Sequence, residues 1–274
     1  MQSLHSPIKY FGGKGMMQNK ILKYIPEHFG YLEGCVGGGS IFFAKRKSPI
    51  EVLNDINQNI YSLFYVLQNK EMFSRFRERC ELSYYHEVLR TEAKDKLKTE
   101  LSIEDRAYYY FYWNRLSVQG AGGFSKQTTE SRQGVSKSVN DFLSSIERLP
   151  EIHNRLRQAL VFSQNIIDLL PQYDLPKWFY YLDPPYHHST RTGARYENDM
   201  DNLEQEKFLQ SVINLKHAKV LISGYDCSEY SILEQNGFIK EQFEVNVINA
   251  NNESRKSIET LWMNYQIQES LFNI

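Results

Sequence analysis

The sequence predicts an α/β fold in which a mainly parallel sheet carries a mainly helical insert. Short apolar runs, each bounded by Gly, Asn, Asp or Pro, indicate buried strands. Segments with helical periodicity separate several of these runs, and strands that alternate with helices favour a parallel sheet. Between roughly residues 70 and 157 the alternation stops, which indicates an insert between the second and third strands.

The expected strands are short and contain β-branched or aromatic side chains. They lie at residues 31–33, 50–53, 160–162, 178–182, 220–222 and 258–263. In the sheet domain, apolar positions also recur at helical spacing in four segments. These helices are expected at 16–25, 58–68, 204–215 and 229–235.

The insert begins with a charged helical stretch, 71–98, and continues into a polar, Gly-rich stretch, 120–138. We expect residues 1–70 and 159–274 to form the sheet domain and residues 71–158 to form the insert. Ligands of open α/β sheets bind outside the carboxyl ends of the strands. An insert that leaves the sheet at that end would overhang the ligand site.

The composition indicates a reducing setting and is compatible with a nucleic-acid partner, but it does not identify the ligand. The net charge of −1 is compatible with a nucleic-acid partner, because a local basic patch is sufficient. The abundant aromatic residues, 19 Tyr and 16 Phe, suit either core packing or base stacking. Cys35, Cys80 and Cys227 form neither a metal pattern nor a disulfide framework, which predicts a reducing, cytoplasmic setting. No apolar run suits a signal peptide or a membrane span.

The strongest chemical signal is the motif Asp-Pro-Pro-Tyr at residues 183–186, directly after the apolar run 178–182. The motif places a carboxylate at the carboxyl end of a buried strand, and two prolines stop the strand and stiffen the turn. Such a turn suits an amino group on a base, whose lone pair is delocalised into the ring. Asp183 and the Pro184 carbonyl would accept the two amino hydrogens, and the Tyr186 ring would stack on the base. The competing interpretation is a Pro-rich turn with an incidental Asp.

A glycine turn follows the first predicted strand and includes Gly37, Gly39 and Ser40. Glycines let the backbone approach a ligand closely, and the helix that follows would favour a carboxylate at its start. A plain glycine turn is an equal alternative. Phe42 occupies the third glycine position of a dinucleotide-binding pattern, and no Gly-Lys-Ser/Thr follows. Neither a dinucleotide fingerprint nor a phosphate loop is therefore predicted.

Asp55 stands at the end of the second predicted strand, about 20 residues after the glycine turn. An acidic side chain at this position typically holds the hydroxyls of a ribose. A helix cap is the competing role, because Asp and Asn both cap helices well. Near the start of the chain, the segment 8–15 combines lysines, aromatic rings and glycines, and would suit closure over a nucleoside.

Together these motifs resemble the Dam-like, alpha-group adenine DNA methyltransferases. In chain order they are Lys-Tyr-Phe-Gly-Gly-Lys at 9–14, the glycine turn at 33–40, Asn-Asp at 54–55 and Asp-Pro-Pro-Tyr at 183–186. The resemblance covers residues 8–55 and 183–265 well. It implies a Rossmann-like S-adenosylmethionine-dependent methyltransferase sheet with a reversed hairpin at its end. It also implies that the helical insert recognises the target.

The resemblance assigns roles to individual residues. Asp183, Pro184 and Tyr186 would form the catalytic turn. The residues that would contact S-adenosylmethionine, the methyl donor, are Tyr10, Lys14, Gly37, Gly39, Ser40, Asp55, Asn165 and Ile166. Two positions depart from the family pattern. Asn-Ile at 165–166 replaces an Asp followed by an aromatic residue, and Cys35 replaces a bulky aromatic residue.

Double-stranded DNA is the partner that the resemblance implies. The segment 111–117 is similar to the Asn-Arg segment of the family, whereas 119–124 lacks the Arg-Tyr-Asn signature of GATC readers. GATC specificity is therefore not carried over to this chain. The expected DNA-contacting residues are Asn114, Arg115, Lys126, Arg132, Lys137, Arg255 and Lys256. Ordinary solvated loops are the alternative for both regions, because Glu130, Glu253 and Glu259 lie close to these cations in the sequence.

The expected function is therefore methylation of the N6 amine of an adenine that has been flipped out of duplex DNA. The alternatives are an RNA adenine N6-methyltransferase and a Rossmann-like DNA-binding module without catalysis. A protein-glutamine enzyme would carry Asn in place of Asp183. No metal is expected, because the adjacent His187 and His188 have no matching ligands at metal spacing. A cognate restriction enzyme is a candidate partner.

Overall fold

A computed structural model describes residues 4–10, 14, 17–186, 199–248 and 254–267. The chain forms two compact units. The first contains Met1–Met16, Gly37–Lys45 and Gln58–Val161, and the second contains Met17–Val36, Arg46–Asn57 and Phe162–Ile274. The segment 71–158, which the sequence predicts as an insert, lies wholly within the first unit, together with the N-terminal segment and residues 37–40 of the glycine turn.

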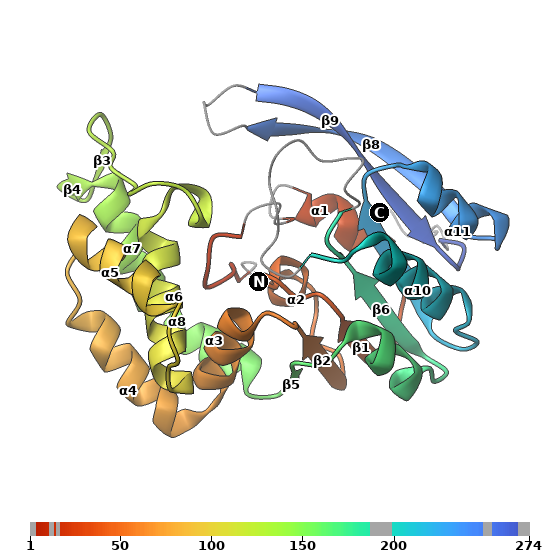
Figure 1. Ribbon diagram of the computed structural model, residues 1–274, viewed down its shortest axis with the longest axis horizontal. Helices are drawn as coiled ribbons and strands as arrows, with labels where there is room; N and C mark the ends of the chain where they lie inside the picture. The colour runs from red at the N-terminus through yellow and green to blue at the C-terminus, as the bar shows by residue number, and fades with distance from the viewer. Residues whose placement is uncertain (1–3, 11–13, 15–16, 187–198, 249–253, 268–274) are drawn as a thin grey trace, which may run out of the picture. The chain divides into compact units, whose positions relative to one another are not determined.

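A seven-stranded sheet organises the fold, with the strand order β5-β2-β1-β6-β7-β9-β8 (Figure 1). Its strands are β1 (Gly30–Glu33), β2 (Ile50–Asn54), β5 (Leu160–Phe162), β6 (Trp178–Leu182), β7 (Lys219–Gly224), β8 (Ile239–Ile248) and β9 (Ser254–Met263). Strand β1 pairs in parallel with β2 and β6, and β6 pairs in parallel with β7. Strand β9 runs antiparallel to both β7 and β8. The predicted Rossmann-like sheet with a reversed terminal hairpin is confirmed.

The central strands are buried on both faces, which explains why they appear in the sequence as continuous apolar runs. All residues of β1 and β6 are buried. Alternate side chains point to opposite faces, so Leu32 and Tyr180 belong to a core that also contains Phe208 and Leu209. Burial of each such side chain contributes roughly 1.5–3 kcal/mol.

The helices of the second unit are short, apart from α10. They are α1 (Gln18–Ile21), η2 (Leu22–Tyr24), α9 (Ile166–Leu169), η4 (Leu170–Tyr173), α10 (Asn202–Ile213), η6 (Ser228–Tyr230) and α11 (Ser231–Gln235). Helix α10 begins at a reciprocal capping box in which Asp201 and Glu204 each bind the other's backbone N–H. The predicted helix at 16–25 is present only as the short α1 and η2. No helix in the described part of the chain is long and apolar enough to cross a membrane.

The first unit is helical. Its helices are α2 (Ser40–Ala44), α3 (Gln58–Gln68), α4 (Lys70–Glu81), α5 (Glu87–Lys96), α6 (Ile103–Leu116), η3 (Val118–Gly120), α7 (Lys137–Glu147) and α8 (Leu149–Leu156). Helix α6 is central, because it packs against α3, α4, α5 and α7. The predicted helical stretch 71–98 is divided into α4 and α5, and α5 begins at the cap residue His86. A small hairpin, β3 (Ser131–Arg132) and β4 (Val135–Ser136), turns through Gln133 and Gly134, both with positive φ.

Candidate active site

The predicted catalytic turn lies at the carboxyl end of β6. Asp183 directly follows Leu182, which pairs with Ile222 of β7, so Ser223 comes beside it. The Ser223 hydroxyl donates to Oδ1 of Asp183 at 3.0 Å, and the hydroxyls of Tyr181 and Ser223 are 2.9 Å apart. A serine has one proton to donate and a carboxylate only accepts, so the Tyr181 hydroxyl donates to Ser223. Asp183 is thus oriented by a buried relay of two hydroxyls.

Tyr186 ends the turn and is buried, with 8% of its surface exposed. Its hydroxyl donates to Oε1 of Glu259 at 2.6 Å, and its ring lies edge-on to Tyr225 with 4.6 Å between the ring centroids. Burial raises the pKa of Tyr186 well above its usual value, and the nearby Asp183 and Glu259 carboxylates raise it further. The phenol therefore remains protonated and serves as a donor to Glu259.

Carboxylates gather at the carboxyl edge of the parallel strands. Glu33 ends β1 and is buried, and it accepts a hydrogen bond from the Tyr31 hydroxyl at 2.6 Å. Burial raises the pKa of the Cys35 thiol well above its usual value, and Asp55, Asp183 and Glu33 raise it further, in that order. Asp55 directly follows β2 and Asp183 directly follows β6, and both strands run parallel to β1, so the two carboxylates lie at the same edge of the sheet.

The backbone around Asp55 is held by Asn54, the first residue of the Asn-Asp motif, to which the sequence analysis assigned no role. Asn54 is buried, and its amide donates to the carbonyls of Gly34 and Gln164 at 3.0 Å each. Its Oδ1 accepts the N–H of Gln164 at 2.8 Å. Asn54 therefore ties the turn after β1 to the turn after β5. Asp55 itself is half-buried and accepts the N–H of Asn57 at 2.9 Å.

Asp55 does not occupy the cap position of α3, since that helix begins at Gln58 and the cap position directly precedes it. Asn165, in contrast, is a helix cap. It precedes α9, and its side chain accepts the N–H of Ile167 at 2.9 Å. Ile166 is buried in the sheet core and lies against Gly34, where a Cβ would clash with it.

Two glycines of the glycine turn have positive φ values, a backbone conformation that other residues adopt only with strain. Gly37 and Gly39 have φ values of 49° and 69°. A Cβ on Gly37 would lie 2.8 Å from the ring of Tyr10, so the structure brings this predicted donor-binding tyrosine onto the turn. Ser40 is half-buried and begins α2, and Lys14 is buried.

Two of the predicted DNA-contacting residues are buried at the carboxyl end of α6. Asn114 accepts the N–H of Lys9 at 2.8 Å and donates to the carbonyls of Lys9 and Gly120 at 2.7 and 3.1 Å. Arg115 is 7% exposed and donates to the Asp141 carbonyl. Both side chains therefore bind backbone groups of the first unit.

The remaining predicted DNA-contacting residues lie on the hairpin region and on β9. Lys126 and Arg132 are exposed, and Lys137 pairs with Glu130 at 2.5 Å. The backbones of Arg255 and Lys256 pair with Val247 and Asn246, so these two residues lie on a strand and not in a loop. The side chains of Arg255 and Lys256 lie outside the described part of the structure, and so do residues His187 and His188.

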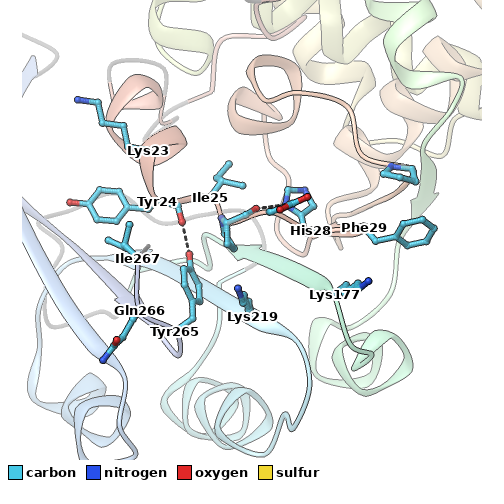
Figure 2. A pocket seen from close by; sticks show the side chains of 13 residues that line it. Lys23, Tyr24, Ile25, His28, Phe29, Lys177, Lys219, Tyr265, Gln266 and Ile267 are labelled. Carbon is cyan, nitrogen blue, oxygen red and sulfur yellow. Dashed lines mark hydrogen bonds between the residues drawn. The ribbon is translucent and has the colours of Figure 1, made fainter. Parts of the chain in front are cut away.

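A separate cavity of ≈ 690 Å³ lies at the opposite edge of the sheet (Figure 2). It is lined by residues at the start of β1, β6 and β7 or just before it, among them His28, Lys177 and Lys219. Figure 2 shows the Tyr265 hydroxyl directed at the Tyr24 carbonyl, to which it donates at 2.7 Å. The candidate active site lies at the carboxyl ends of the strands, so this cavity is not part of it. Within the described residues, no group of three or more His, Cys, Asp or Glu could hold a metal ion.

The family model of the D12 class N6 adenine-specific DNA methyltransferases matches residues 10–253. The chain belongs to this family. Its activity is therefore the methylation of adenine in DNA, as the sequence predicts, and the RNA and non-catalytic alternatives are set aside.

Curated relatives agree with the family match. The DNA adenine methylase of Escherichia coli (strain K12) is 23% identical, and the match covers 94% of each chain. The DNA N-6-adenine-methyltransferase of Escherichia phage P1 is 24% identical over 80% of this D12-class chain and 29% of that protein. Among solved structures, a precorrin-6y C5,15-methyltransferase from Geobacter metallireducens covers 90% of this chain and 86% of its own, at 11% identity and a TM-score of 0.35.

Proposed function

We propose that the enzyme transfers a methyl group from S-adenosylmethionine to the N6 amine of an adenine flipped out of duplex DNA. The observation that supports this most directly is the turn at 183–186. It places a carboxylate, two prolines and a buried aromatic ring at the carboxyl end of β6. Asp183 shares this edge of the sheet with Asp55 and Glu33, and all three carboxylates raise the pKa of the Cys35 thiol.

The residues at this edge suit the proposed donor, which carries a cationic sulfonium and a ribose. Three carboxylates, Glu33, Asp55 and Asp183, raise the pKa of the Cys35 thiol, and their negative charge would favour a cation at this edge. Asp55 would accept hydrogen bonds from the ribose hydroxyls. The proposed donor-binding residues are Tyr10, Lys14, Gly37, Gly39, Ser40 and Asp55, with Asn165 and Ile166 beside the adenine ring. When bound, S-adenosylmethionine would supply an electrophilic methyl group.

The catalytic turn would act on the amine of the target base. The Asp183 carboxylate accepts one amino hydrogen and the Pro184 carbonyl accepts the other, which localises the lone pair on N6. The ring of Tyr186 provides an aromatic face for the base. Cys35 does not act as a nucleophile, because its raised pKa keeps the thiol protonated at neutral pH. Positioning and electrostatics therefore account for the rate enhancement.

DNA would be held by exposed cations on its phosphates, and the base would leave the stack because its amine is out of reach within the duplex. We assign phosphate contacts to Lys126, Arg132, Lys137, Arg255 and Lys256. For Asn114 and Arg115 we propose an indirect role. Asn114 ties the end of α6 to the N-terminal segment through Lys9, and Arg115 ties it to α7 through the Asp141 carbonyl.

The substrate assignment is tested by incubating the enzyme with labelled S-adenosylmethionine and duplex DNA, single-stranded DNA or RNA. Digestion to nucleosides and mass spectrometry then identify the methylated base. We expect N6-methyladenine from duplex DNA. Label in RNA adenine, or in a base other than adenine, would contradict the proposal.

A further inference from the structure

Three buried side chains from three other elements hold the turn at 183–186. Ser223 of β7 donates to Oδ1 of Asp183 at 3.0 Å. Gln205 of α10 donates to the Pro185 carbonyl at 2.7 Å. Glu259 of β9 accepts from the Tyr186 hydroxyl at 2.6 Å. The exposed fractions of these three side chains are 0%, 1% and 2%, respectively.

The contact with Glu259 is the most informative of the three. A buried carboxylate is costly unless it is hydrogen-bonded, so its presence in the sheet needs a partner. The Tyr186 phenol supplies that partner, because burial keeps it protonated. A hydrogen bond from a neutral hydroxyl to a carboxylate is short and strong, in agreement with the 2.6 Å distance.

The pairing of β7 with β9 fixes both neighbours of the Tyr186 ring. Gly224 pairs with Thr260, and the residues next to this pair are Tyr225 and Glu259. Tyr225 meets the Tyr186 ring edge-on, while Glu259 holds the hydroxyl at its end. One strand pair therefore restrains the ring in two directions.

We propose that Glu259, Ser223 and Gln205 are positioning residues for methyl transfer, which set the Asp183 carboxylate, the Pro185 carbonyl and the Tyr186 ring of the turn before DNA binds. This inference rests on the proposed function of that turn. A misplacement of about 1 Å at a reacting group can slow a reaction on the order of a hundredfold. Side chains that never touch the base can therefore control the rate of the chemical step.

The experiment compares Glu259→Met, which removes the acceptor, with Glu259→Gln, which restores an acceptor oxygen. Glu241→Met is the matched control, because Glu241 is exposed on the neighbouring strand β8. For each variant, single-turnover methylation, the melting temperature and the affinity for S-adenosylhomocysteine are measured. We expect Glu259→Met to slow methylation about tenfold or more and Glu259→Gln to stay within about threefold of wild type. Glu241→Met should match wild type, and the affinity should be unchanged throughout.

A second comparison shows whether Glu259 acts through Tyr186. If the two side chains form one unit, Glu259→Met combined with Tyr186→Phe should be no slower than Glu259→Met alone. Losses that multiply in the double variant overturn the proposal, as does a folded Glu259→Met variant with a wild-type rate. If Glu259→Met does not fold, the methylation rate of the Tyr186→Phe variant tests the coupling instead. A rate about fivefold or more below wild type supports the coupling, and a wild-type rate overturns it.

Failure of this inference can be told apart from failure of the proposed function. If an Asp183→Ala variant methylates at the wild-type rate, the turn has no role in catalysis and the proposed function of the turn fails. If Asp183→Ala is inactive and a folded Glu259→Met variant is fully active, the proposed function of the turn stands and only the positioning role of Glu259 fails.

Discussion

Asp55 holds a local turn in the structure, and its proposed second role is to bind the ribose of the methyl donor. Its Oδ1 accepts the N–H of Asn57, and its carboxylate also acts on the Cys35 thiol. An asparagine at this position would keep the acceptor for Asn57 and lose only the charge. The substitution Asp55→Asn therefore separates the proposed ribose contact from the local turn.

We expect Asp55→Asn to weaken S-adenosylhomocysteine binding about tenfold or more, since hydrogen bonds to charged groups contribute roughly 1.5–3 kcal/mol. At saturating donor, the single-turnover rate should stay within about threefold of wild type. Isothermal titration and rapid-quench assays measure the two quantities. Asp168→Asn, on the exposed side of α9, is the control. Unchanged affinity in Asp55→Asn would assign Asp55 to the turn alone.

The residues that sequence analysis identified are those that lie within short motifs. Asp183 and Asp55 directly follow strands, and Tyr186 ends the turn that begins at Asp183, so local pattern and spacing predict their places. Ser223 and Glu259 could not be found in this way, because they lie 40 and 73 residues from their partners in the turn. Only the pairing of β7 and β9 brings them together.

At the scale of elements, the N-terminal segment and helix α6 are joined through Lys9. Asn114 binds both backbone groups of Lys9, and the Lys9 ammonium donates to the carbonyls of Arg115 and Ser117 at 2.9 and 3.2 Å. Burial, and after it the positive charge of Arg115, lower the pKa of Lys9 to about 8 against a smaller opposite effect of Asp141. The segment that carries Tyr10 is thus tied to the helix that precedes the hairpin region.

This lowered pKa gives the folded protein a pH dependence. The folded state disfavours the charged ammonium, so below pH 8 Lys9 opposes folding. As the pH rises from about 8 toward about 10.4, the unfolded chain holds the proton longer than the folded one, and stability rises. Lys9→Met lacks this group. The melting temperature of wild type relative to Lys9→Met should therefore increase between pH 7.5 and 10. A difference that decreases over this range would show that the charged form stabilises the fold.

Strands with a continuous apolar run could be predicted from the sequence, and strands without one could not. Each predicted strand corresponds to a strand in the sheet, because each contains a short apolar run. Strand β8 lies at the sheet edge and was missed. Its Phe243, Val245 and Val247 are separated by polar residues, so most of the strand contains no continuous apolar run.

At the scale of the whole molecule, the open question is how an enzyme with a net charge of −1 binds DNA. The exposed Lys126 and Arg132 of the hairpin region are the described candidates for phosphate contacts. Each contact releases counterions and adds about 0.9 to the slope of log K against log salt. Replacing both residues by alanine should reduce that slope by roughly 2. Fluorescence anisotropy at several salt concentrations measures it. The control is Lys23→Ala, which lies at the edge of the sheet opposite the candidate active site. A slope that is unchanged in the double variant would show that the hairpin region makes no phosphate contacts.

The most direct test of the central claim is the single-turnover rate of Asp183→Ala on duplex DNA that carries the target adenine. The rate should fall at least about a hundredfold, because the amine loses the carboxylate that localises its lone pair. S-adenosylhomocysteine affinity and base flipping, followed by 2-aminopurine fluorescence, should remain close to wild type in the same preparation. A rate within about tenfold of wild type would contradict the assignment of Asp183 as the catalytic carboxylate.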